Sequence, residues 1–390
     1  MAIYKLFPEK DATIYSEYEL KNTGIDEILE LDLAFNSDTP STTSGSLITE
    51  ASRYLLKFPD SGITNIIDNK ISSSLTSSYK AYLKLFVADA SEIPLDYNLE
   101  CYPVSGAWNM GTGRFNNSPE TRDGVCWGFR SLSGSNPWLT SSFATYVTAS
   151  YISNSFEQRA GGGNFYTGSA TLYPVATQSF TYITNKDISF DITNTVTLHY
   201  SGSKGISGSI INDGLIIKNT DSNEFNTETQ FNLKYFSMDT HTVYPPQIEF
   251  RWDDSIYNTG SSTSTIITDT NPVVSLSNNK QEFDQDSIQK FRVYARDRFP
   301  TLAFQTSSVY LTNKYLPTSS YYSLVDLNSG DTVFDFDTNY TKISADATSN
   351  YFTLYMDGLE PERYYKVLIK TIIDGSELIL DDDYYFKVKL

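Results

Sequence analysis

Apolar and polar residues alternate with a period of two along most of the chain. In AYLKLFV, residues 81–87, Leu83 and Leu85 share one face, while Tyr82 and Lys84 share the other. The stretches PQIEFRW and YYFKVKL alternate in the same way. This pattern is typical of half-buried antiparallel strands, because successive side chains of a strand point to opposite faces of the sheet.

No stretch shows the period of an amphipathic helix convincingly. The best candidate, IDEILELDLAF, has leucines at positions 29, 31 and 33, so it too is predicted to be a strand. ISFDITNTV (Ile188 to Val196) is also predicted as a strand, and DITNTVTLHY places His199 in a strand. Loops rich in Gly, Ser, Asn and Asp separate these segments, so we predict an all-β chain of sandwiches or barrels.

The polar, turn-rich segment 258–274 suggests a boundary between two domains. We predict an N-terminal domain at 1–255, a linker at 256–272 and a C-terminal domain at 273–390. The first domain is large for one sandwich but within the range of all-β domains. The second has the size of an immunoglobulin-like sandwich.

The charge balance narrows the classes of partner. The chain of 390 residues has 47 acidic and 29 basic side chains and a net charge of −18, which disfavours direct nucleic-acid binding. The sequence contains no run of about 18 apolar residues, so no membrane-spanning helix is predicted. The opening MAIYKLFPEKDATIYS lacks the apolar core of a signal peptide, so we expect synthesis in a cytosol.

Two cysteines, Cys101 and Cys126, leave two alternatives open, a disulfide or two reduced thiols. The absence of an export signal favours the thiols.

Searches for catalytic motifs suggest that the chain is not an enzyme and has no cofactor or metal. There is no G-x-S-x-G or H-E-x-x-H sequence, and GGGNF (161–165) lacks the Lys and Ser/Thr of a phosphate loop. Neither His199 nor His241 has an evident nucleophile nearby. Clusters such as Asp381–Asp383 fit solvated turns better than calcium loops. A glycan hydrolase stays a weaker alternative, because paired carboxylates cannot be placed across a cleft from sequence.

One long loop combines irregular sequence with large aromatic residues. SGAWNMGTGRFNNSPETRDGVCWGF, Ser105 to Phe129, holds two tryptophans and five glycines. Trp108 and Trp127 are expected to pin the loop by burial, with glycines at its tight turns. The other interpretation makes Trp108 or Trp138 an exposed platform on which a sugar ring stacks. The structural interpretation is favoured.

The order of short motifs in residues 1–255 resembles DNRLRE-type jelly-roll domains, which are similar to carbohydrate-binding modules. The hexapeptide that names the family is absent, and Cys126 stands where the family usually has Thr. The resemblance implies an N-terminal jelly-roll β-sandwich. The matching positions are Asn22, Thr23, Gly24, Ser52, Arg53, Lys57, Phe58, Trp108, Gly111, Thr112, Gly124, Val125, Trp127, Phe190, Asp191, Ile192, Thr193, Asn212, Gly214, Thr242, Pro246, Ile248 and Phe250.

In the C-terminal domain, GLEPERYYKV resembles the step that leads into the penultimate strand of fibronectin-III-like domains. The resemblance implies an immunoglobulin/fibronectin-III-like β-sandwich with Leu359 in the core and Tyr364 or Tyr365 at the strand start. Tyrosines lie on both faces of such strands, so one face is expected to be an interface. We predict Tyr364 and Tyr384 as interface or glycan-stacking residues, and a hairpin between YYFKVKL and YYKVLIK that turns at 374–375 or around 381–383.

The whole chain is similar to structural or neck proteins of tailed phages, including phages of marine hosts. MAIYKLFPEKDATIYS, SRYLLKF and the late KIS…NYFTL…LEPERYYKV run carry that similarity. It implies a non-enzymatic virion structural protein of the neck or collar, tail or head surface, assembled in the host cytoplasm. Its partners would be other virion proteins and copies of itself, with no nucleic acid and no membrane. The alternative is a carbohydrate-binding adhesin that contacts a host surface glycan.

Overall fold

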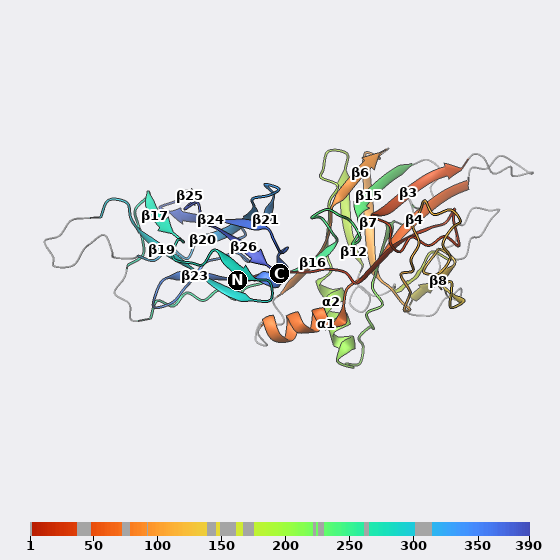
Figure 1. Ribbon diagram of the computed structural model, residues 1–390, viewed down its shortest axis with the longest axis horizontal. Helices are drawn as coiled ribbons and strands as arrows, with labels where there is room; N and C mark the ends of the chain where they lie inside the picture. Colours follow the sequence, from red (N-terminus) through yellow and green to blue (C-terminus); the bar gives the residue numbers. More distant parts are fainter. Residues whose placement is uncertain are drawn as a thin grey trace, which may run out of the picture. The chain divides into compact units, whose positions relative to one another are not determined.

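The computed structural model is rich in β-structure, as the alternation predicts (Figure 1). Strands account for 45% of the residues and helices for 8%. Among the described residues, no helix is long and apolar enough to cross a membrane. The structure describes residues 2–36, 48–71, 79–91, 93–138, 146–148, 161–166, 175–220, 224, 230–260, 265–300 and 314–390.

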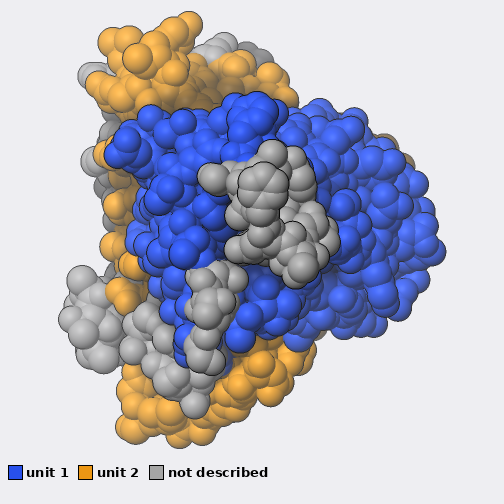
Figure 2. All heavy atoms as spheres, turned by 90° about the vertical axis from the view of Figure 1, so that its left-hand side faces the viewer, with its two compact units in different colours: residues 1–5, 71–79, 250–390 blue, residues 6–70, 80–249 orange. Residues whose placement is uncertain are grey.

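The chain divides into two compact units, which are coloured separately in Figure 2. Strands β1 (Ala2–Leu6) and β16 (Gln247–Trp252) each run across the division. The predicted N-terminal domain at 1–255 and unit 2 therefore do not contain the same residues. Unit 2 comprises residues 6–70 and 80–249, and unit 1 comprises residues 1–5, 71–79 and 250–390.

Unit 2 is organised by an eight-stranded sheet that curls into a half-barrel. Its order is β12-β7-β14-β4-β3-β15-β6, with β2 also paired to β4. Strand β4 changes neighbours along its length, because its first four residues pair with β3 and its last six with β2. The strands are β2 (Lys10–Tyr15), β3 (Ile28–Asn36), β4 (Ile48–Lys57), β6 (Val87–Ser91), β7 (Asp96–Pro103), β12 (Ala176–Thr181), β14 (Leu215–Asn219) and β15 (Phe231–Phe236).

Shorter pairings complete unit 2. Strand β5 (Lys80–Leu85) pairs antiparallel with β13 (Ile188–Asp191). Within the tryptophan loop and beyond it, β8 (Phe129–Ser131) pairs with β9 (Asn136–Pro137), and β10 (Tyr146–Thr148) pairs with β11 (Asn164–Tyr166).

The chain is β-rich as predicted, but the expectation of no helix is wrong, because the described part of unit 2 includes helical segments. They are α1 (Asp60–Asn65), a π-helix (Ile66–Lys70) and α2 (Thr193–Ser203). His199 lies in α2 and not in a strand. The threonines and valine of α2 favour strands intrinsically. Packing overrides that preference, because the helix buries Val196 and His199, one turn apart.

Two sheets contribute to one core in unit 1. The first has the order β17-β19-β23-β22, and the second β18-β26-β24-β20-β21, with β25 also paired to β24. All pairs are antiparallel except β18 with β26. The elements are β17 (Pro272–Ser275), β18 (Glu282–Asp284), β19 (Ile288–Asp297), β20 (Ser320–Asp326), β21 (Thr332–Phe334), β22 (Ser344–Ala345), β23 (Asn350–Tyr355), a 3₁₀ helix (Met356–Gly358), β24 (Tyr364–Ile373), β25 (Ser376–Leu380) and β26 (Tyr385–Lys389).

Stacked aromatic rings fill that core. Phe291 of β19 and Phe352 of β23 stack with ring centroids 5.2 Å apart, and Tyr322 of β20 stacks on Phe352 at 4.3 Å. Phe386 of β26 lies 5.1 Å from Phe291. Each ring contributes about 2–3 kcal/mol through burial, so this row joins the two sheets energetically.

The segment predicted as a linker, 256–272, packs within unit 1. Ile267 is in the core of the unit, and the Asn258 amide donates to the Ala345 carbonyl at 3.0 Å. Residues 261–264 of the segment lie outside the described residues. Ile3, at the other end of the chain, belongs to the same core.

The predicted pairing of YYFKVKL with YYKVLIK forms, since β26 pairs antiparallel with the start of β24. Strand β25 lies between them in the sequence, so neither proposed turn joins the two strands directly. Strands β24 and β25 are joined by Asp374 and Gly375, which have φ angles of 49° and 76°. Two positive φ angles match the type I′ turn that an Asp-Gly pair favours. Strand β26 then pairs with the first half of β24.

Candidate functional site

The tryptophan loop of unit 2 is a packed structure. Trp108, Trp127 and Trp138 are 3%, 0% and 1% exposed, and they share one apolar cluster. The Trp108 indole N–H donates to the Asp213 carbonyl at 2.8 Å, and the Trp138 indole N–H donates to the Cys126 carbonyl at 3.0 Å. Neither Trp108 nor Trp138 therefore offers a ring face for sugar stacking, and Trp252 of unit 1 is also buried.

The side chain of Asn22 fixes the backbone of this loop by hydrogen bonds. Its amide donates to the carbonyls of Met110 at 2.7 Å and Val125 at 2.8 Å. Its side-chain oxygen accepts the Gly113 N–H at 2.8 Å and the Gly24 N–H at 3.3 Å. All four hydrogen-bonding positions of the amide are used, so one buried side chain joins both arms of the loop to the connection between β2 and β3.

Glycine is required where the loop meets Asn22. A Cβ on Gly24 would lie 2.0 Å from the Met110 carbonyl oxygen. Gly111 has a φ of +82°, and a Cβ there would lie 2.3 Å from the Asn22 Oδ1 atom. The Met110 backbone cannot move away cheaply, and the Asn22 side chain is fixed by its hydrogen bonds, so these two glycines allow the close approach. The NTG sequence and the glycine-rich loop are thus parts of one clamp.

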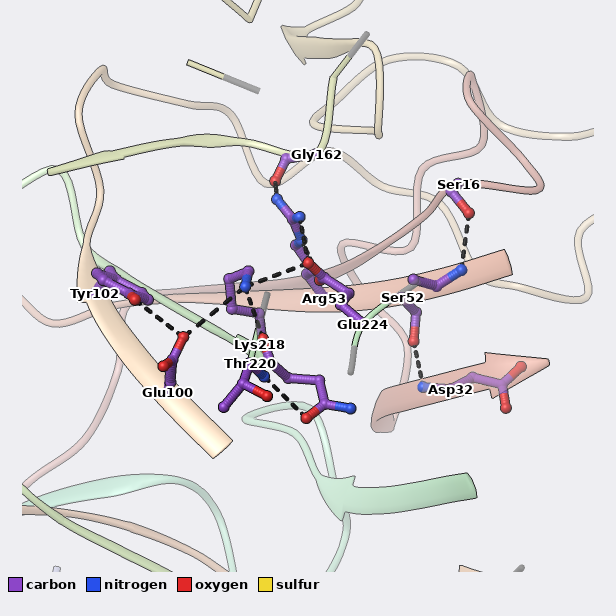
Figure 3. A network of polar contacts seen from close by, with 12 residues as sticks. Ser16, Asp32, Ser52, Arg53, Glu100, Tyr102, Gly162, Lys218, Thr220 and Glu224 are labelled. Atoms are coloured by element: carbon purple, nitrogen blue, oxygen red, sulfur yellow. Dashed lines mark hydrogen bonds and ion pairs between the residues drawn. The ribbon is translucent and has the colours of Figure 1, made fainter. Parts of the chain in front are cut away.

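A second polar centre of unit 2 is a buried charge cluster, shown in Figure 3. Arg53, with 0% exposure, forms a two-point contact with Glu224, at 2.6 Å through Nε and 2.7 Å through Nη2. Its Nη1 donates to the Gly162 carbonyl at 2.6 Å, and its guanidinium lies 5.1 Å from the Trp127 ring centroid. The cluster therefore links β4 to the loop that carries Gly162.

Lys218 of β14 completes the cluster. Its ammonium lies 3.3 Å from Glu224 and 4.0 Å from Glu100, and it donates to the Asn219 carbonyl at 2.6 Å. Glu100 also accepts the Tyr102 hydroxyl at 2.9 Å. Two cations and two carboxylates balance each other, as buried charges require. Glu224 is 1% exposed, whereas the Glu100 side chain is 18% exposed, so only the Glu224 carboxylate is fully enclosed.

Asp11 of β2 is an isolated buried carboxyl. It is 1% exposed, and it accepts the Met238 N–H at 2.6 Å. The pKa of Asp11 is raised to about 8, mainly by burial and to a smaller extent by Asp239 and Asp26, against the lowering effect of the Met238 hydrogen bond.

The cysteines and the helical histidine are buried as well. Cys101 and Cys126 are free thiols in the structure, and burial raises the pKa of both. Burial lowers the pKa of His199 to about 3, with a smaller effect from Lys57, so its imidazole is neutral near pH 7. No group of three or more His, Cys, Asp or Glu among the described residues is placed to hold a metal ion.

Unit 1 carries an open groove beside strands β18, β24 and β26. Its volume is about 730 Å³, and its lining residues are Lys280, Gln281, Glu282, Tyr364 and Tyr385. Tyr364 and Tyr385 are 43% and 42% exposed, and their ring centroids lie 6.2 Å apart with the planes at 67°.

Of the aromatic residues predicted to lie on the surface of unit 1, Tyr384 is buried, and Tyr385 is exposed instead. Tyr384 is 5% exposed, belongs to the core of unit 1 and donates its hydroxyl to the Lys280 carbonyl, so it does not present a surface. Tyr385 is exposed in its place. Alternation identifies it, because Phe386 and Val388 point into the core and the odd-numbered neighbours point outward. Tyr364 lies in the groove as an exposed aromatic residue.

Comparison with known proteins does not assign the chain to a family. The chain matches no protein-family model and no curated protein sequence. A solved structure of a DUF4785 family protein from Legionella pneumophila is similar at 8% identity and a TM-score of 0.16. That similarity covers 100% of this chain, which spans 62% of the length of the Legionella chain.

Proposed function

We propose that the chain is a non-enzymatic structural protein of a tailed-phage particle, in the neck or collar, the tail or the head surface. The observation that carries this proposal is the locked tryptophan loop. Loops that bind or catalyse usually leave side chains accessible. Here the largest side chains are buried, and Asn22 uses every hydrogen-bonding position to fix the backbone. A rigid scaffold suits assembly better than chemistry.

The proposal includes the fold of each unit. Unit 2 would be a jelly roll of the DNRLRE type, and its curled sheet with the Asn22 clamp supports this. Unit 1 would be an immunoglobulin/fibronectin-III-like sandwich. In support, the Tyr365 hydroxyl donates to the Glu360 carbonyl at 2.9 Å at the start of β24, beside the buried Leu359. This resembles the tyrosine corner of such sandwiches.

Mass spectrometry of density-purified particles tests the proposal. We expect the chain at a fixed copy number relative to the major capsid protein, retained through a second gradient. Its presence only in the unassembled host lysate would overturn the structural role.

A second candidate function is carbohydrate binding. The exposed tyrosine pair beside Lys280, Gln281 and Glu282 favours it, since two half-exposed rings meet polar side chains in one groove.

A further inference from the structure

The floor of the groove in unit 1 is built from two aromatic rings on adjacent strands. Tyr364 begins β24 opposite Lys387, and Tyr385 begins β26 opposite Lys366, two residue pairs further along the ladder. Both rings stand at the start of paired strands. Tyr364 lies beneath the Lys387 ammonium, 5.9 Å from its ring centroid. The two ring planes meet at 67° and so form a corner, and each ring is about half exposed.

The wall of the groove is the segment Lys280–Glu282. Its backbone is fixed, because the Tyr384 hydroxyl donates to the Lys280 carbonyl and the Lys387 N–H donates to the Gln281 carbonyl at 2.8 Å. The Glu282 carboxylate pairs with Lys389. The Lys280 side chain is exposed, and no carboxylate of the described part of the chain lies within ion-pair distance of it. The groove is therefore preorganised and keeps one cation available.

From this arrangement we infer that the groove binds a saccharide with a pyranose ring seated on the Tyr364–Tyr385 corner. A volume of about 730 Å³ accommodates a ligand of a few sugar units. Pyranose faces are C–H surfaces that pack on aromatic rings, while their edges carry hydroxyls. Gln281 and Glu282 supply donors and acceptors for those hydroxyls.

The lining distinguishes a saccharide from a protein partner. Each of the five lining residues has a polar group, and none is aliphatic. Protein interfaces usually centre on a desolvated apolar anchor, whereas this groove mixes rings and polar ends throughout. The available Lys280 ammonium favours saccharides that carry a carboxylate. This inference does not depend on particle assembly, since it concerns the isolated chain.

An array of neutral and uronic-acid-containing oligosaccharides, probed with the full chain, provides the test. We expect the wild type to bind members of the array. Tyr364→Ala and Tyr385→Ala should each weaken binding about tenfold or more. Tyr182→Ala is the matched control, because Tyr182 is 65% exposed on unit 2 and should bind as the wild type does. Lys280→Ala should weaken binding of the acidic members more than that of the neutral members.

Two further checks keep the inference falsifiable. Circular dichroism shows whether each variant is folded, and Gln281→Ala, which leaves both strands untouched, should also weaken binding. The inference is overturned if no array member binds the wild type, or if binding survives both tyrosine substitutions. It is also overturned if a photo-crosslinker at position 385 captures a particle protein and no saccharide competes. Particle composition is measured separately, so either proposal can fail alone.

Discussion

Arg53 is fully buried, and its position determines how several segments of unit 2 meet. Removing a guanidinium from water costs several kcal/mol, and that cost is offset here by Glu224, the Gly162 carbonyl and the face of Trp127. The same carboxylate also faces Lys218. Glu224 is thus the shared counter-charge of two buried cations.

Glu224→Gln should therefore destabilise the protein strongly. The substitution leaves Arg53 and Lys218 without their main counter-charge, which we expect to cost about 3–5 kcal/mol of unfolding free energy. Urea denaturation measures it. Asp68→Asn is the control, because it weakens an exposed ion pair with Lys204 and should change stability little. Equal effects of the two substitutions would contradict the role of the cluster.

The buried carboxyl of Asp11 makes the stability of the folded protein depend on pH. Its pKa rises from an ordinary 3.8 to about 8, so between these values the folded protein holds a proton that the unfolded chain releases. The contribution of Asp11 to stability is fullest below about pH 4 and is lost as pH rises toward 8. Asp11→Asn, which still can accept the Met238 N–H, should flatten this slope and be more stable than the wild type near pH 8. Unfolding midpoints from pH 4 to pH 8 measure it, and parallel slopes would refute it.

Among the elements, the tryptophan loop shows how a long irregular segment becomes rigid. Its apolar rings are buried, but the backbone is fixed by the polar contacts of Asn22. If the loop opened, water could hydrogen-bond the backbone groups that Asn22 now contacts. The closed loop is therefore stabilised by ring burial and by the Asn22 hydrogen bonds together.

Asn22→Ala should release the loop. Two donated and two accepted hydrogen bonds are lost, at about 1 kcal/mol each, so we expect a destabilisation of about 2–4 kcal/mol and faster proteolysis between residues 105 and 129. Asn69→Ala removes a single exposed contact to Asn65 and serves as the control. Unchanged cleavage of the loop in Asn22→Ala would show that the rings alone hold it.

Strands were predictable from the sequence where one face is buried. The alternation in β5, β24 and β26 follows directly from their burial in the structure, whereas β16 is buried on both faces over most of its length. The first helical region also left a signal, since Ile63 of α1 and Ile66 and Ile67 of the following π-helix have helical spacing and are buried. Helix α2 left none, because its residues favour a strand and only the surrounding packing makes it helical.

The site was less predictable than the strands. Alternation places Tyr385 outward and Tyr384 inward, but the groove needs the segment 280–282, about a hundred residues away in sequence. The partner of Arg53 was equally hidden, since Glu224 lies 171 positions further along the chain. Contacts of such sequence separation are set by the folded topology, and no local pattern reports them.

At the scale of the whole molecule, composition and architecture point in one direction. A net charge of −18 favours solubility, which would suit the proposed particle protein before assembly. Each unit has its own β-sheets, and unit 1 exposes a groove on a rigid sheet. These features suit a scaffold protein with a recognition surface.

Immunogold labelling of purified particles tests this account most directly. Antibodies raised against residues 1–255 and, separately, 271–390 would be applied to intact and disrupted particles. We predict label at the head–tail junction, on the capsid or along the tail. Label confined to distal fibre tips would favour the adhesin instead, and absence of label from both intact and disrupted particles would contradict the proposed structural role.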